Sequence, residues 1–203
     1  TQDRVVLDIE VTEQATGELS FGAGYSTSEG VIGDISLTER NLLGNGQFVR
    51  LKLGGSTERI QVDFSFTEPR FLDTNIAAGF DLFYKDVDQI NTSAYKSRRI
   101  GGSLRAGMPL SENLWLGTSY TLSHDNIYEV DCAELEGSYS DGCRASLAVL
   151  QAKGEALTSA LGGSLTYDTR NHPRNPNRGL YFQVATDFAG VGGDVQYVRV
   201  VGE

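Results

Sequence analysis

Two cysteines that lie close together are the residues of this sequence best placed for covalent chemistry. Cys132 and Cys143 are in the polar stretch DCAELEGSYSDGC. A disulfide between them would close a loop, which fits an oxidising compartment and an exported protein. Two unpaired thiols, or part of a metal site that lacks its other ligands, are the alternatives. Neither His124 nor His172 has zinc-ligand spacing from the pair, so we expect the disulfide.

Carboxylates around the same loop are the second group that could do chemistry, because several of them together could bind calcium. We expect a solvated acidic surface loop instead. The two histidines have no serine or cysteine partner in a recognisable motif, and glycine pairs such as GVGGD lack the lysine and helix of a phosphate loop. A carboxylate-pair hydrolase stays open, but no pattern marks one. We therefore predict no enzyme and no catalytic, cofactor-binding or metal site. The carboxylates are Asp125, Asp131, Glu134, Glu136 and Asp141.

The composition excludes several classes of protein. The 203 residues carry a formal net charge of -10, whereas nucleic-acid binding needs a basic face. No window approaches the roughly 18 consecutive apolar residues of a membrane-spanning helix. Twenty-four glycines, nine tyrosines and nine phenylalanines, with only four prolines, favour strands and tight turns. The chain begins at Thr1 without a leader, so we expect any signal peptide to have been removed or to lie upstream.

The elements that must position these residues are strands with two different faces. In the stretch IQVDFSFT, residues 60–67, apolar and polar residues alternate strictly. Similar alternation recurs along the chain and predicts about ten strands, joined as neighbouring antiparallel hairpins. These strands are close to the ~10 residues that a tilted strand needs to cross a bilayer, and longer than the ~5–6 residues usual in a sandwich.

The polar faces of the predicted strands carry both signs of charge. Arg50 and Lys52 stand against Asp34 and Asp63, and Arg99 and Arg105 stand against Asp81. A dry sandwich core would not tolerate these charges, although a solvated outer face would. We therefore predict an all-β, antiparallel transmembrane β-barrel meander with hydrocarbon on its apolar side. A soluble acidic β-sandwich that acts as a binding module is the alternative.

The connections between the strands differ between the two ends of the sheet. At one end the segments NLLGNG, PRFLDT, PLSEN and NHPRNPNRG are compact. At the other end STSEG and GSTER are short, while Asp86 to Lys96 and Val130 to Leu157 are long. Compact turns on one rim and longer loops on the other are typical of outer-membrane barrels. The segment RASLAVLQAKGEAL within the longest loop predicts a short helix.

Three motifs in this order resemble one family. TGELSFGAGYSTSEGVIGDISLTERNLLGNGQ is similar to the junction between the last periplasmic POTRA module and the first barrel strands in the outer-membrane β-barrel assembly and translocation superfamily. FSFTEPRFLD resembles the fourth strand and its Pro-aromatic turn, and YDTRNHPRNPNRGLYF resembles the recurring Asp-x-Arg-Asn turn. The resemblance is strongest to the assembly factors of alphaproteobacteria, and it covers essentially the whole chain.

This resemblance implies a domain organisation. Residues 1–14 would be the end of a POTRA module and residues 15–203 the N-terminal part of the barrel domain. The chain would hold about ten of the family's sixteen strands, in a closed or an open arrangement. The family's inward-folded loop with a Val-Arg-Gly-Phe motif and its closing strand with a terminal aromatic residue have no match here. We therefore expect a partial chain.

The resemblance also implies a function. The family assembles and inserts β-barrel proteins into the bacterial outer membrane, with its N-terminal end in the periplasm. The implied partners are unfolded outer-membrane proteins, the lipoproteins of the assembly machine and outer-membrane lipid, and no cofactor is implied. A related translocation pore, or a passive porin-like channel, is the alternative.

The first barrel strand is the expected site of this function. Gly22 and Gly24 lie at its centre, where glycine weakens a strand and leaves the backbone edge exposed. An exposed edge can act as a template for another strand, and in the family the seam between first and last strands opens laterally. The alternative is that both glycines only permit bending or close packing. The predicted gate strand comprises Glu18, Leu19, Ser20, Phe21, Gly22, Ala23, Gly24, Tyr25 and Ser26.

One further group of residues is interpreted as structural. Asp168, Arg170, Asn171, Pro173 and Gly179 fall within the turn motif YDTRNHPRNPNRG. Asparagine, aspartate, proline and glycine each favour turn conformations. We expect these residues to form a turn network that fixes the entry of the chain into the next strand.

Overall fold

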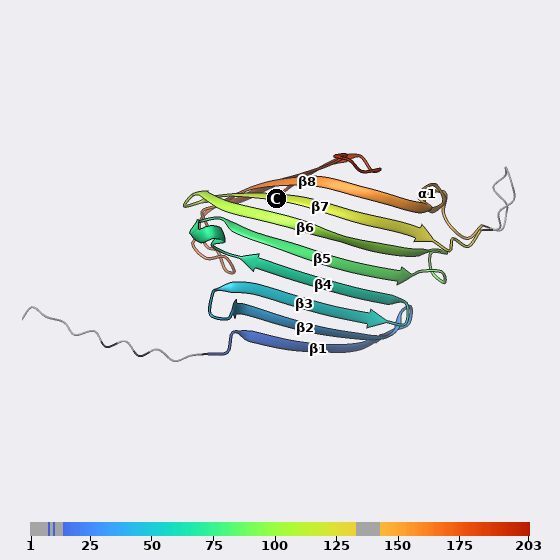
Figure 1. Ribbon diagram of the computed structural model, residues 1–203, viewed down its shortest axis with the longest axis horizontal. Coiled ribbons are helices and arrows are strands. Elements are labelled where there is room, and N and C mark those ends of the chain that lie inside the picture. Colours follow the sequence, from blue (N-terminus) through green and yellow to red (C-terminus); the bar gives the residue numbers. More distant parts are fainter. Residues whose placement is uncertain (1–7, 9, 11–13, 133–142) are drawn as a thin grey trace, which may run out of the picture.

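The computed structural model describes residues 8, 10, 14–132 and 143–203. They form one antiparallel sheet in which the spatial order of the ten strands follows the chain (Figure 1). The predicted antiparallel meander is confirmed. The strands are β1 (Gly17–Ser26), β2 (Gly30–Leu42), β3 (Gln47–Ser56), β4 (Arg59–Glu68), β5 (Ala77–Asp88), β6 (Lys96–Ser111), β7 (Leu114–Tyr128), β8 (Gly154–Asp168), β9 (Tyr181–Ala189) and β10 (Tyr197–Gly202). The helical turn η1 (Phe71–Asp73) and helix α1 (Leu147–Gln151) lie in connections.

The sheet has two open edges among the described residues. β1 pairs only with β2, and β10 pairs only with β9. Figure 1 shows β1 along one side of the sheet and β8 on the opposite side. The strands lengthen toward the middle of the sheet, from 10 residues in β1 to 16 in β6, and shorten to 6 in β10.

One face of the sheet is apolar and exposed. The register places Phe21 opposite Ile35, and Ile35 opposite Leu53. These side chains are 73%, 45% and 41% exposed. In the described part of the chain only small residues are buried, namely Ala94, Ala145, Ala160, Ala189, Ser123 and Ser159. The apolar face therefore has no protein core to cover it, as expected for strands that face lipid.

The opposite face is polar, and its charges are paired across neighbouring strands. Arg105 of β6 donates to the Asp81 carboxylate of β5 over 2.5 and 3.1 Å. Arg99 was expected to stand against the same carboxylate, but it pairs with Asp125 of β7 instead. The reason is the register, which sets Arg99 opposite Asp125 and Asp81 opposite Ser103.

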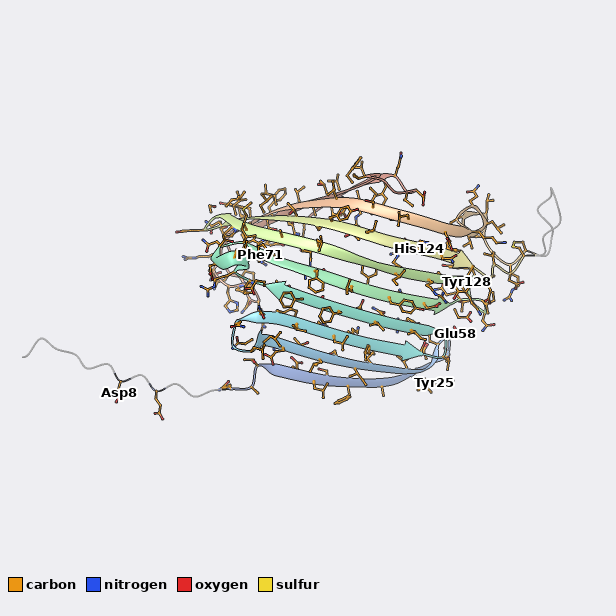
Figure 2. All side chains as sticks on the ribbon, viewed as in Figure 1. Asp8, Tyr25, Glu58, Phe71, His124 and Tyr128 are labelled. Atoms are coloured by element: carbon orange, nitrogen blue, oxygen red, sulfur yellow. A yellow bond between two sulfur atoms is a disulfide. The ribbon has the colours of Figure 1, made fainter. Side chains whose placement is uncertain are left out.

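The two rims of the sheet differ, as Figure 2 shows, with Phe71 at one rim and Tyr25, Glu58 and Tyr128 at the other. We name the first the turn rim; its connections are residues 43–46, 69–76, 112–113 and 169–180. We name the second the loop rim; its connections are residues 27–29, 57–58, 89–95, 129–153 and 190–196. The connection 169–180 is longer than the other three, so the connections of the turn rim are not all as compact as expected.

Two boundaries at the loop rim differ from the sequence-based prediction. The connection predicted from Asp86 to Lys96 is shorter, because Asp88 still pairs with Lys96 across the strands. The predicted helical segment is helical only over Leu147–Gln151, and β8 begins at Gly154. Strand pairing with β7, which sets Ile127 opposite Gly154, overrides the helix propensity of the following alanine and leucine residues.

Candidate functional site

β1 forms one of the two unpaired edges of the described sheet. Each residue of β1 pairs with β2, from Gly17 opposite Glu39 to Ser26 opposite Gly30. All residues before Ser26 are exposed. Within the described residues no strand pairs with the other edge of β1, so half of its backbone N–H and C=O groups lack a sheet partner.

The side chains of β1 follow the two faces of the sheet. Leu19, Phe21 and Tyr25 lie on the apolar face and are 56%, 73% and 77% exposed. Glu18 and Gly22 lie on the polar face, opposite Thr38 and Asp34. An incoming antiparallel strand of the same alternation would therefore continue both faces.

The two central glycines of β1 have open surroundings. A Cβ added at Gly24 would meet no atom within 4 Å, and at Gly22 it would meet Asp34 at 3.6 Å, an ordinary contact. Neither glycine has a positive φ angle. Within the described sheet, neither backbone conformation nor packing requires glycine at these positions. The one physical consequence of these glycines is therefore a weak strand propensity at an exposed edge.

Tyrosines mark the loop-rim end of the apolar face. Tyr84 and Tyr128 both donate to the Asp86 carboxylate, over 3.1 and 2.9 Å. Arg98 donates to the same carboxylate over 2.8 Å and lies 5.4 Å from the Tyr128 ring centroid. Aromatic side chains with polar tips are typical of the border between an apolar band and water in outer-membrane barrels.

The predicted turn residues are brought together at the turn rim, at the end of β8. Arg170 donates to Asp168 through its backbone N–H and its guanidinium, over 2.8 to 2.9 Å. The hydrogen bonds from the Arg170 side chain, and after them the one from its backbone N–H, lower the pKa of Asp168 to about 2. The Asn171 side chain accepts from the backbone N–H groups of Asn177 and Arg178, each over 3.2 Å.

Gly179 completes this turn, and Pro173 lies within the same connection. Gly179 has φ +103°, and a Cβ there would collide with the carbonyl of Thr169. Sequence reasoning did not include Thr169, whose hydroxyl accepts from the Leu180 N–H over 2.8 Å. It also did not include Tyr181, whose ring lies 4.3 Å from the Arg170 guanidinium. The sequence did carry a signal for this contact, because an arginine and an aromatic residue flank the turn and such pairs often stack.

The remaining candidate residues are placed apart from β1, at the loop rim and in the turn. The structure joins Cys132 and Cys143 in a disulfide, with Cα atoms 4.3 Å apart. Asp131 pairs with Arg144 at 3.3 Å, and Asp125 pairs with Arg99 on the polar face. Glu134, Glu136 and Asp141 lie outside the described residues. His124 lies 3.6 Å from Glu155, and the His172 ring accepts two backbone N–H groups in the turn.

No metal or membrane-helix site is found in this part of the chain. Residues 8, 10, 14–132 and 143–203 contain no group of three or more His, Cys, Asp or Glu side chains that could hold a metal ion. Their helices are all too short to cross a membrane.

Comparison with known proteins identifies the family. The Omp85 superfamily domain matches residues 41–203. The outer membrane protein assembly factor BamA of Neorickettsia risticii is 29% identical over 96% of this chain and 25% of its own length. BamA of Nitratidesulfovibrio vulgaris is 31% identical over 100% of this chain and 24% of its own. The sorting and assembly machinery component 50 homolog of Mus musculus is 29% identical over 94% of this chain and 38% of its own length.

A solved structure shares the fold. BamA from Haemophilus ducreyi, lacking POTRA domains 1–3, matches with a TM-score of 0.66 at 23% identity, over 93% of this chain and 36% of that chain. The present chain thus spans about a quarter of the length of the two bacterial relatives named above. It belongs to the Omp85 superfamily, and its strands are part of a β-barrel of the outer membrane.

Proposed function

We propose that this chain is the part of an outer-membrane assembly factor that templates incoming barrel strands at β1. The observation that carries the proposal is that β1 has a partner on one side only among the described strands and that its two glycines have open surroundings. The names of the bacterial relatives, outer membrane protein assembly factors, support the same function. Strand pairing is noncovalent, so the proposed mechanism uses no catalytic residue and no cofactor.

The physical basis is the cost of unpaired backbone groups in lipid. A backbone N–H or C=O without a partner in hydrocarbon costs several kcal/mol, so an edge inside the bilayer favours the addition of a strand. β1 offers such an edge over the ten residues Gly17–Ser26. Its glycines reduce the packing that would hold β1 to its own neighbours, which makes exchange of partners easier.

The proposed partners follow from this mechanism. Unfolded outer-membrane proteins would supply the strand that pairs with β1, and lipid would cover the apolar face. Residues 1–14 would be the end of a POTRA module and residues 15–203 the N-terminal part of the barrel domain; most of residues 1–13 lie outside the described residues. Lipoproteins of the assembly machine would act with the whole protein. The Cys132–Cys143 disulfide suits a loop outside the cytoplasm.

Site-specific crosslinking in the full-length protein tests the proposal. Single cysteines at Ser20, Gly22 and Gly24 should form disulfides with cysteines in the terminal strand of a barrel protein that is being assembled. A cysteine at Ser36, on the same face but in β2 with partners on both sides, is the matched control. It should give no adduct. Absence of adducts at all three β1 positions would rule out templating and favour the pore alternative, which predicts ion conductance without dependence on a substrate strand.

A further inference from the structure

A groove of about 1090 Å³ lies at the turn rim, between the connections 43–46 and 69–76. Its floor includes Phe66, Phe80 and Leu104, which lie opposite one another on the apolar face. The ring centroids of Phe66 and Phe80 are 5.6 Å apart, and Leu104 is 63% exposed. The groove is therefore continuous with the surface that hydrocarbon covers.

The wall of the groove is a turn with fixed backbone geometry. The Asp73 N–H donates to the Arg70 carbonyl over 3.1 Å, and the Thr74 hydroxyl donates to the Phe71 carbonyl over 2.6 Å. The Phe71 N–H donates to the Ile76 carbonyl over 2.8 Å. These bonds hold residues 70–76 in place, so the side chains on this turn project from a defined frame.

Two opposite charges on this turn are available for a ligand. The Glu68 carboxylate accepts from the Gln47 amide over 2.7 Å and from the Arg70 backbone N–H over 3.1 Å. Among the described residues, neither the Arg70 guanidinium nor the Asp73 carboxylate has a hydrogen-bond or salt-bridge partner, and both line the groove. The mouth of the groove thus presents the Arg70 guanidinium and the Asp73 carboxylate, both without a hydrogen-bond or salt-bridge partner in the described part of the chain, next to an apolar floor, while the third charge, on Glu68, already accepts two hydrogen bonds.

Exposed apolar side chains lie on the two connections that form the groove. Leu43 is 87% exposed, Leu72 80% and Phe71 46%. Leu43 and Leu72 have positive φ angles of 54° and 53°, a conformation that is uncommon for residues other than glycine. Large exposed apolar side chains at a rim that borders the membrane face fit the boundary between hydrocarbon and headgroups.

We propose that this groove binds one zwitterionic phospholipid with a phosphoethanolamine headgroup. An acyl chain lies along Phe66, Phe80 and Leu104, the phosphate meets the Arg70 guanidinium, and the ammonium group meets the Asp73 carboxylate. Guanidinium–phosphate hydrogen bonds are among the strong charge-assisted ones. An anionic phosphatidylglycerol has no ammonium group, so it leaves Asp73 unpaired beside a negative headgroup. The groove therefore selects phosphatidylethanolamine over phosphatidylglycerol.

Native mass spectrometry of the full-length protein in mild detergent tests this site. With the two lipids added at equal concentration, wild type should carry phosphatidylethanolamine several-fold more often than phosphatidylglycerol. Arg70→Gln should lower the affinity for phosphatidylethanolamine on the order of tenfold, equivalent to ~1.4 kcal/mol. Asp73→Asn should remove the preference between the two lipids, because the ammonium group then has no anionic partner.

Arg174→Gln is the matched control, since Arg174 lies at the same rim in the connection 169–180 and does not line the groove. It should bind lipid as wild type does. Equal lipid binding by Arg70→Gln and Arg174→Gln would overturn the proposal. Equal binding of both lipids by wild type would also overturn it, and that measurement does not require any variant to fold. The result is independent of strand templating, because β1 contributes nothing to the groove.

Discussion

Glycine lies at the centre of both β1 and β6, but its surroundings in the two strands are opposite. In β6 a Cβ at Gly101 would lie 2.5 Å from the Leu122 carbonyl oxygen and 2.7 Å from the Phe83 ring. At Gly107 it would lie 2.9 Å from the Trp115 ring. In β1 a Cβ at Gly24 would meet nothing within 4 Å. Interior glycines therefore make room for aromatic rings, whereas those of β1 leave an edge loosely packed.

This difference bears on the role proposed for β1. The rings of Phe83 and Trp115 cover backbone that glycine leaves bare, a device that stabilises sheets. No described side chain covers Gly24 in this way. A strand that must exchange partners benefits from weak packing, while the strands that carry it must stay fixed. The contrast between β6 and β1 is what we expect if the interior of the sheet is rigid and the β1 edge is adaptable.

Alanine substitutions give the most sensitive test of the comparison. Gly101→Ala should lower the free energy of unfolding by ~1–3 kcal/mol, because the methyl group overlaps the Leu122 carbonyl and the Phe83 ring. Gly24→Ala should leave stability unchanged or raise it by up to ~1 kcal/mol, because alanine loses less entropy in a strand. Urea unfolding of the full-length protein in detergent micelles measures both. Equal losses in the two variants would contradict the contrast.

Ion pairs provide a second, smaller test. Arg105 makes two hydrogen bonds to Asp81 inside the sheet, and their side chains are 42% and 25% exposed. Glu18 and Arg40 meet at 3.4 Å at the β1 edge, where their side chains are 57% and 63% exposed. Double-mutant cycles to alanine should give a coupling energy of ~0.5–1 kcal/mol for the interior pair and close to zero for the edge pair. A larger coupling at the edge would mean that β1 is held firmly.

The smallest expected effect is a loss of stability at low pH in the turn before β9. Hydrogen bonds from Arg170 lower the pKa of Asp168 to about 2, from a usual value of 3.8. A carboxyl group with a lowered pKa stabilises the fold above its unfolded pKa and loses this contribution as the pH falls through the folded value. Wild type should therefore be more stable than Asp168→Asn at neutral pH, and the difference should vanish between about pH 4 and about pH 2.

Hydrogen exchange at the β8–β9 turn, compared between the two proteins over this pH range, checks the expectation. β1 is far along the sheet from this turn and serves as the internal reference. A pH-dependent change of equal size in β1 would show that the effect is global and does not arise from Asp168.

The alternation of residues was enough to predict the strands and their faces. In IQVDFSFT the side chains of Val62 and Phe64 share one face and those of Asp63 and Ser65 the other, as the register confirms. The period of a strand is two, so a face is set by sequence parity alone. The predicted connections were less accurate, since pairing between Asp88 and Lys96 extends β5 and β6 beyond the residues that look like strand.

The candidate site was only partly readable in the sequence. Glycines in β1 predicted a weak strand, but similar glycines occur in β6, where they lie beneath aromatic rings. The groove at the turn rim was not predicted at all, because it is formed by two connections that lie 23 or more positions apart in the chain and meet only through the pairing of β3 with β4.

The sequence by itself determined that this chain forms long antiparallel strands with one apolar and one charged face, because side-chain direction alternates with every residue. Only the tertiary structure decided which charges meet, since Arg99 faces Asp125 and not Asp81 through the register of β6 with β7. It alone also enclosed Gly101 under a ring. Partners across a sheet depend on register and strand order, which no local pattern encodes.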